Sequence, residues 1–243
     1  MTLTYYKDNS ELFTSCVLWW QGRDQTSLGF PILPAGVTAT PAGSWTDNTT
    51  GVTRSVKNFD GSTNYISLSD NDAWAMFEGD FTITGWFRLP NRSRHYGILS
   101  QALHGGAYWC YLFNTNGNIQ LTGYAVDGSG VVNFAYYCSC PTNDNTWYHI
   151  VIQRYGTLCL IYINGVSQSV ATAQTWRNTS NFASPLVIGN NISYNDYLNG
   201  NIKDLMIYKG RALTQPEIKL LMNRTHPITG AGLLPGGYDY WRA

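Results

Sequence analysis

Residues 200–218 read GNIKDLMIYKGRALTQPEI, and this stretch decides the fold. A β-rich run ends at Tyr208, and a helix start follows six residues later. Thr214 is a preferred N-cap residue, and Glu217, three positions on, completes a capping box by reaching back to the cap. The pattern predicts a short helix, about Gln215 to Asn223, that packs on the rim of a β-sandwich and closes it.

The composition indicates a β-rich protein that forms interfaces. The chain has 243 residues, of which 12% are charged and 14% aromatic, and its net charge is zero. A single all-β sandwich commonly reaches this length. A nucleic-acid-binding protein would show a basic patch, so nucleic acid is not expected as a partner. No apolar run approaches the ~18 residues that a membrane helix needs, and no signal peptide is recognised at the N-terminus.

Strand-like segments recur at short intervals with turn residues between them, as in a sandwich. The five cysteines lie mostly in apolar segments, so we expect free thiols in a protein made in a reducing cytoplasm. Residues 21–57 are rich in Gly, Pro and Thr and are interpreted as a surface excursion with one or two short strands. The predicted strands are Val17–Trp20, Tyr65–Leu68, Phe81–Leu89, Gly97–Gln101, Trp109–Asn114, Ile119–Tyr124, Val131–Tyr137, Tyr148–Tyr155, Thr157–Ile163, Leu186–Ile188 and Gly200–Tyr208.

Four ordered stretches together resemble the laminin-G-like jelly rolls of the concanavalin A-like lectin/glucanase superfamily. GNIKDLMIYKGRALTQPEI is similar to the closing strand and capped helical turn of that family. NFDGSTNYISL (58–68) followed by GDFTITGWFRL (79–89) resembles its opening strand pair. WYHIVIQRYGTLCLIYINGV (147–166) resembles its central hairpin, and VLWWQ (17–21) its first strand.

The resemblance implies an all-β fold, a two-sheet antiparallel jelly-roll β-sandwich with one short C-terminal helix. The closing strand would lie in the centre of a sheet. We expect an N-terminal arm over 1–15, the laminin-G-like jelly-roll domain over 16–225 and a C-terminal tail over 226–243.

Catalysis is not expected. The β-glucanases of this superfamily use two Glu residues on one strand, flanking the bond that is cleaved. This chain has three Glu in total, Glu11, Glu78 and Glu217, and no two share a predicted strand. Its four histidines are scattered, and His149 lies in a core-like hairpin where a structural role is favoured. No catalytic residue is therefore assigned.

No cofactor is required by the sequence, and calcium is the one that the resemblance implies as an option. Many laminin-G-like domains hold Ca²⁺ with carboxylates and backbone carbonyls. Asp60 and Asp204 match acidic positions of the family. The alternative for Asp60 is an Asx-type turn before Gly61, and for Asp204 it is a bond to backbone or Arg donors. Lys203 replaces a second acid, which weakens the metal interpretation.

Carbohydrate binding is the commonest use of the family, and it needs exposed aromatic rings beside polar groups. Two stretches fit: HYGILSQALHGGAYW (95–109) and ISYNDYLN (192–199). In the second, the predicted carbohydrate-binding residues are Tyr194, Asn195, Asp196 and Tyr197.

The tail LLPGGYDYWRA (233–243) carries three aromatic residues, Tyr238, Tyr240 and Trp241, and we predict that they bind a partner or the chain itself. Laminin-G-like chains of this kind resemble components of tailed-phage virions. The resemblance implies a non-enzymatic virion surface protein, used as capsid decoration, head fibre or tail fibre and located in the virion after synthesis in the host cytoplasm. Its partners would be the major capsid protein or other virion proteins, with a second copy of the chain and glycans also open. The alternative is a carbohydrate-binding module of a bacterial surface or secreted system.

Overall fold

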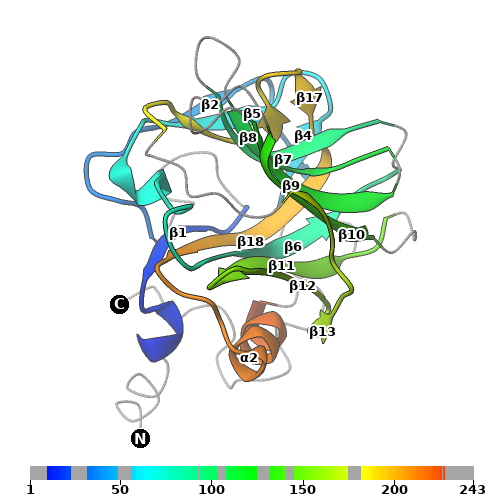
Figure 1. Cartoon of the computed structure of the whole chain (residues 1–243). Coiled ribbons are helices and arrows are strands. Elements are labelled where there is room, and N and C mark those ends of the chain that lie inside the picture. The colour runs from blue at the N-terminus through cyan, green and yellow to red at the C-terminus, as the bar shows by residue number, and fades with distance from the viewer. Residues whose placement is uncertain are drawn as a thin grey trace, which may run out of the picture.

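The computed structural model shows a sandwich of two large antiparallel sheets with one α-helix, α2 (Gln215–Thr225), near its C-terminal end (Figure 1). In the described residues, two short 3₁₀ helices, η1 (Ser10–Phe13) and η3 (Asp72–Trp74), accompany the sheets. The predicted fold class is thus confirmed. The structure describes residues 10–22, 32–48, 56–91, 94–102, 108–115, 117–124, 132–140, 145–174, 182–225 and 227.

The first sheet, sheet A, contains the closing strand of the domain near its centre. Strand β18 (Asn199–Lys209) pairs with β6, β4 and β1, so the predicted central position is confirmed. In spatial order the strands are β13 (Val166–Ser167), β12 (Leu158–Ile163), β11 (Tyr148–Tyr155), β6 (Phe81–Arg88), β18, β4 (Val56–Asp60) and β3 (Thr46–Asn48), with β1 (Cys16–Trp20) also on β18.

The second sheet, sheet B, carries a small hairpin on its outer side. The hairpin consists of β16 (Asn190–Asn191) and β17 (Asp196–Tyr197). In spatial order sheet B is β14 (Ala171–Gln174), β10 (Val132–Ser139), β9 (Asn118–Tyr124), β8 (Tyr108–Phe113), β7 (Tyr96–Ala102), β15 (Leu186–Ile188), β5 (Tyr65–Leu68) and β2 (Ala39–Ala42).

Alternation along the strands builds the core between the sheets. In β9, Ile119 and Leu121 are fully buried in the main hydrophobic cluster, while Gln120 and Thr122 between them are only half-buried. Ile83 of sheet A belongs to the same cluster. Each such side chain stabilises the fold by about 1.5–3 kcal/mol on burial. Side chains of the opposite parity on β8 and β9 therefore form the outer face of sheet B.

Helix α2 begins as the sequence predicts. The backbone N–H of Thr214 donates to Glu217 Oε2 at 2.8 Å, which is half of a capping box. Burial acts to raise the pKa of Glu217, but hydrogen bonds from Thr214 and the charge of Arg211 outweigh it and leave that pKa lowered. The helix runs to Thr225, two residues further than predicted.

The position of α2 differs from the predicted one. Instead of packing on the rim, it covers the outer face of sheet A, where Ile218 and Leu221 join Met206 and Tyr208 of β18 in a second hydrophobic cluster. The reason is that β18 is apolar on both faces: Ile207 points into the main core, and Met206 and Tyr208 point outward. A strand buried on both sides needs a cover, which the helix supplies.

Residues near the N-terminus also pack on the outer face of sheet A, beside α2. Leu12 of η1, within the predicted N-terminal arm, is buried in the helix-side cluster with Trp19. Within the described part of the excursion over 21–57 lie the short strands β2 and β3, as expected, and β4 begins at its end. All five cysteines are free thiols, and four of them are buried. Burial raises the pKa of both Cys138 and Cys159 to about 12, so these thiols stay protonated at neutral pH.

Candidate functional site

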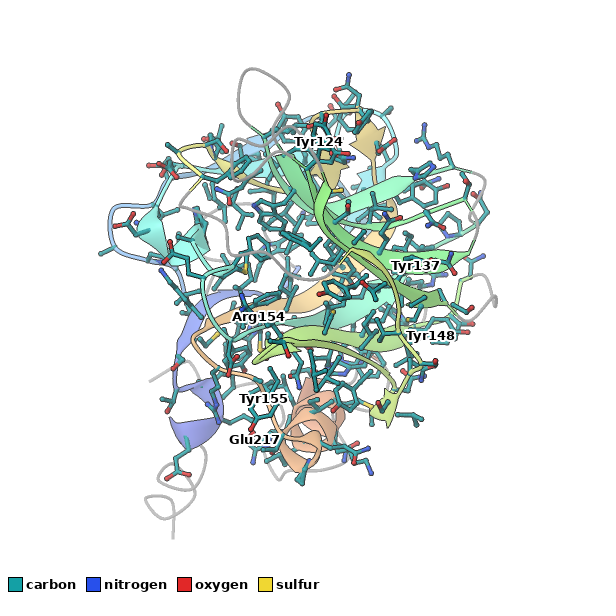
Figure 2. All side chains as sticks on the ribbon, in the orientation of Figure 1. Tyr124, Tyr137, Tyr148, Arg154, Tyr155 and Glu217 are labelled. Atoms are coloured by element: carbon teal, nitrogen blue, oxygen red, sulfur yellow. The ribbon has the colours of Figure 1, made fainter. Side chains whose placement is uncertain are left out.

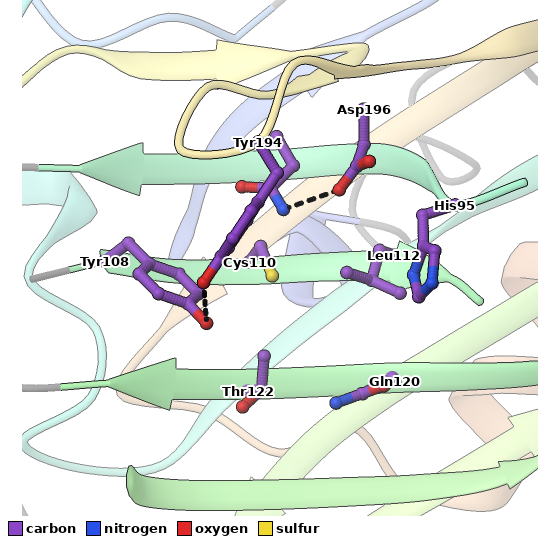
Figure 3. Close-up of a pocket in the computed structure, with 9 residues that line it drawn as sticks. His95, Tyr108, Cys110, Leu112, Gln120, Thr122, Tyr194 and Asp196 are labelled. Carbon is purple, nitrogen blue, oxygen red and sulfur yellow. Dashed lines mark hydrogen bonds between the residues drawn. The ribbon is translucent and has the colours of Figure 1, made fainter. Parts of the chain in front are cut away.

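A cavity of about 310 Å³ lies on the outer face of sheet B, beside the β16–β17 hairpin (Figure 3). Its size is at the lower end of the range of ligand pockets, about 300–1,000 Å³. Strands β8 and β9 and the hairpin region supply most of its wall. The lining residues are His95, Tyr108, Cys110, Leu112, Gln120, Thr122, Asn191, Tyr194 and Asp196.

Strand register explains why these side chains meet. Tyr108, Cys110 and Leu112 are two residues apart on β8 and therefore share the outer face. Cys110 pairs with Thr122 on β9, and Leu112 pairs with Gln120. Four residue steps along β8 give the floor of the cavity a length of about 13 Å.

The hairpin is fixed against β7 by a glycine and a serine. A Cβ atom on Gly97 would lie 2.2 Å from the backbone nitrogen of Asn191, so only glycine permits this approach. Ser100 Oγ donates to the Asn190 carbonyl at 2.8 Å and accepts from the Ile192 N–H at 3.3 Å. These contacts hold the hairpin above the outer face of sheet B.

Three tyrosines gather at one end of the cavity. Tyr108 and Tyr124 stack with ring centroids 5.9 Å apart, and Tyr194 meets Tyr108 edge-on at 5.4 Å. The Tyr194 hydroxyl donates to the Tyr108 hydroxyl at 3.3 Å, yet the Tyr194 residue is 62% exposed. Burial and the hydrogen bond with Tyr194 raise the pKa of Tyr108, which stays a neutral phenol. An exposed ring on a fixed base is a surface on which a flat apolar face of a ligand can stack.

The other end of the cavity is polar. Asn191 Nδ2 donates to Asp196 Oδ2 at 3.0 Å, which fixes the carboxylate across the hairpin. Gln120, Thr122 and His95 add an amide, a hydroxyl and an imidazole to the wall. Burial, with the charge of Asp196 as a second cause, raises the pKa of the Cys110 thiol on the floor. Aromatic and polar ends together suit a ligand that has both apolar faces and hydroxyl groups.

Two of the four predicted carbohydrate-binding residues line the cavity, and two do not. Tyr194 and Asp196 line the cavity. Asn195 occupies the turn between them with a φ of 56°, a backbone conformation that asparagine tolerates. Tyr197 instead packs beside Tyr65, with ring centroids 6.2 Å apart.

The two stretches predicted for carbohydrate binding, 95–109 and 192–199, meet at this cavity. The first supplies His95 and Tyr108 and the second Tyr194 and Asp196. Sequence reasoning missed the contribution of β8 beyond Trp109 and all of β9. The signal was present in NIQLTGY (118–124), where Gln, Thr and Tyr alternate with buried residues.

The residues predicted to bind calcium do not lie together. Asp60 and Asp204 are separated by five residue steps of β18, about 16 Å, because Asp60 pairs with Asn199. Asp60 Oδ1 accepts from the N–H groups of Ser62, Thr63 and Asn64 at 2.8, 2.8 and 3.0 Å. Burial acts to raise the pKa of Asp60, but these hydrogen bonds outweigh it and hold that pKa well below its usual range. The geometry is that of the turn given as its alternative role.

Asp204 is buried beneath α2 and forms an ion pair with Lys203. Its other oxygen accepts from Trp19 Nε1 at 2.8 Å. Within the described part of the chain, no three His, Cys, Asp or Glu side chains gather to hold a metal ion. Calcium binding stays a prediction.

Two further expectations concern the C-terminal tail and membrane-spanning helices. Tyr238, Tyr240 and Trp241 of the tail lie outside the described residues. No helix in the described ranges has the length and apolar character to cross a membrane.

Comparison with known proteins assigns the family. The sequence model of the concanavalin A-like lectin/glucanases superfamily matches residues 60–219, about two thirds of the chain. The protein belongs to this superfamily, in agreement with the two-sheet jelly roll. No curated protein sequence matches the chain.

Solved structures with a similar fold include binding domains of clostridial toxins. The binding domain of Paraclostridial Mosquitocidal Protein 1 has a TM-score of 0.66 at 19% identity, over 87% of this chain and 52% of that one. The receptor binding domain of botulinum neurotoxin C/D mosaic serotype has a TM-score of 0.63 at 16% identity, covering 86% and 51%. A structure of botulinum neurotoxin type C, whose cell entry depends on interaction with two ganglioside molecules, has a TM-score of 0.63 at 15% identity, covering 89% and 53%. This chain therefore spans about half the length of these domains, and the likeness concerns the fold.

Proposed function

We propose that this chain is a non-catalytic glycan-binding protein that holds its ligand in the cavity on the outer face of sheet B. One observation carries the proposal: the exposed Tyr194 ring stands on Tyr108 beside the carboxylate of Asp196, within one cavity. A sugar ring has apolar faces that stack on tyrosine and hydroxyl groups that donate to carboxylate and amide oxygens.

The similar structures support this proposal at the level of class. They are described as binding or receptor binding domains, and one belongs to a toxin whose entry depends on gangliosides. Gangliosides are glycolipids, so glycan recognition has a precedent on this fold. The precedent does not extend to individual residues at 15–19% identity.

The cavity lacks what glycoside hydrolysis needs. Such enzymes place two carboxyl groups about 5–9.5 Å apart across the bond that is cleaved. Asp196 is the one carboxylate among the described lining residues. Glu217 caps α2 on the outer face of sheet A, and neither Glu11 nor Glu78 lines the cavity. A binding role, without chemistry on the ligand, is the function that this wall supports.

A glycan array with the isolated protein, with and without calcium, tests the proposal and supplies a ligand. The best ligand is then titrated calorimetrically into the wild type, Tyr194→Ala and Tyr155→Ala. Tyr155 is a matched control because it is 61% exposed, against 62% for Tyr194, and belongs to β11 of sheet A. It lies at the opposite end of the molecule from Tyr124, which stacks on Tyr108 of the cavity (Figure 2).

Truncating Tyr194 should weaken binding at least tenfold, about 1.4 kcal/mol, and truncating Tyr155 should leave the Kd unchanged. An array without any bound glycan, or equal affinity in all three proteins, would refute the proposal.

We further propose, from the sequence resemblance alone, that the chain is a surface component of a tailed-phage particle, bound to capsid or other virion proteins. The same resemblance is the source of the expected homo-oligomer and of the virion location. Purified particles should contain the chain at a fixed copy number. If the chain is absent from every assembled particle, the virion role is wrong, and the alternative is a carbohydrate-binding module of a bacterial surface or secreted system.

A further inference from the structure

We infer that the cavity selects uncharged sugars, and that Asp196 is the residue that excludes acidic ones such as sialic or uronic acids. This inference rests on the proposed function and names the ligand class of the same site. Asp196 would act by two effects: it accepts a hydroxyl of a neutral sugar and repels a carboxylate in the same place.

The charges around the cavity carry the inference. Of the nine described lining residues, Asp196 is the one with a negative side chain, and none is Lys or Arg. An acidic sugar is normally recognised by a guanidinium or ammonium group that compensates its carboxylate. Without such a partner, the ligand carboxylate would lose hydration and would also be repelled by the charge of Asp196, and both effects weaken binding.

Two arginines of the described residues before the lining residue His95 form contacts outside the cavity. Arg94 precedes His95, but its guanidinium donates to the Gly61 carbonyl and lies 5.7 Å from the centroid of the Tyr96 ring. Arg88 donates to the Asn145 carbonyl at 3.0 Å. Neither guanidinium takes part in the cavity wall.

Asp196 is built to accept from a neutral ligand. Its Oδ2 is fixed by Asn191, while its Oδ1 has no hydrogen-bond partner among the described residues. The carboxylate acts on its surroundings, since its charge contributes to the raised pKa of the Cys110 thiol. A hydroxyl that reaches Oδ1 gains a charge-assisted hydrogen bond, whereas a carboxylate gains repulsion.

The test compares one oligosaccharide with and without a terminal acidic sugar: lactose against sialyllactose, and a cellobiose-type disaccharide against its uronic acid form. Each pair is titrated into the wild type, Asp196→Asn and Asp70→Asn. The last variant removes one carboxylate from an exposed turn outside the cavity and matches the change in net charge.

In the wild type the neutral member of a pair should bind at least tenfold more tightly than the acidic one. Asp196→Asn should reduce this ratio at least threefold by gaining affinity for the acidic member, and Asp70→Asn should keep the ratio. Raising the salt concentration should also narrow the ratio in the wild type, because repulsion at a partly exposed site is screened. The salt measurement needs no variant and therefore does not depend on folding of a mutant.

The outcomes separate the inference from the proposed function. If the acidic member binds as well as the neutral one or better, with binding still lost in Tyr194→Ala, the inference is wrong and the glycan site stands. If neither member of any pair binds, and the array is empty, the proposed function itself fails.

Discussion

Breaking the buried ion pair between Lys203 and Asp204 should destabilise the fold more than any single surface change. Both side chains are only 3% exposed. Lys203 also donates to the Thr225 carbonyl at 2.8 Å at the end of α2, and Asp204 accepts from Trp19 of β1. The pair thus joins β18 to the helix and to β1 on the outer face of sheet A.

The magnitude follows from the uncompensated charge that is left behind. Lys203→Met keeps most of the length of the side chain but leaves Asp204 buried without its cation, which costs about 3–5 kcal/mol. For a domain of this size each kcal/mol lowers the melting temperature by about 2–4 °C, so a fall of roughly 6–20 °C is expected. Asp204→Asn removes the negative charge that compensates the buried Lys203 ammonium and should cost a similar amount.

The double variant Lys203→Met/Asp204→Asn removes both charges, and its cost should be smaller than the sum of the two single costs by about 2–3 kcal/mol. The assay is urea unfolding of the four proteins at pH 7, with Lys57→Met as the control. Lys57 pairs with Asp47 at 2.8 Å, but that carboxylate side chain is 53% exposed, so its loss should cost less than about 1 kcal/mol. Additive effects of the two single substitutions, or a cost of Lys203→Met no larger than that of Lys57→Met, would show that the buried pair does not stabilise the fold in this way.

Three further predictions concern the hairpin, the helix cap and one turn. Gly97→Ala should displace the β16–β17 hairpin and weaken glycan binding at least tenfold, whereas Gly79→Ala, where an added Cβ meets nothing within 4 Å, should leave the titration unchanged. Glu217→Ala should remove the carboxylate that accepts from the Thr214 N–H at the start of α2 and lower the melting temperature by about 2–4 °C, for a loss of roughly 1 kcal/mol, and no shift in a calorimetric scan would contradict it. The pKa of Asp60 is lower in the folded than in the unfolded state, so its stabilisation is present above about pH 4, the ordinary Asp range, and is lost as the pH falls further. Urea unfolding at pH 6 and pH 3 should thus show a smaller acid loss in Asp60→Asn than in the wild type, and equal losses would count against this account.

Sequence patterns predicted the sheets well where alternation and turn residues agree. Tyr65–Leu68, Tyr148–Tyr155 and Leu186–Ile188 have the bounds expected from sequence. The short strands β14, β16 and β17 were missed because two to four residues carry too little periodicity to stand out. The helix start was predictable from its cap, but its place over sheet A was not, since that depends on which face of β18 the main core leaves uncovered.

The site was predicted in part, for a similar reason. Exposed aromatic and polar residues at 192–199 indicated Tyr194 and Asp196, but Gln120 and Thr122 join them only through the β8–β9 register. The role of Asp204 likewise depends on its partners in the folded chain, Lys203 and Trp19. Lys203, the departure from the family pattern, turns out to be the partner that occupies its carboxylate.

The most direct test of the central claim is a protein-observed NMR titration with the best neutral glycan from the array. The largest chemical-shift changes should fall on amides of β8, β9 and the β16–β17 hairpin, including those of Tyr108, Thr122 and Asp196. Amides of α2, on the outer face of sheet A, and of β12, a strand of that sheet, should not move. Shift changes centred on α2, or spread without reference to the cavity, would contradict the claim that this face binds the ligand.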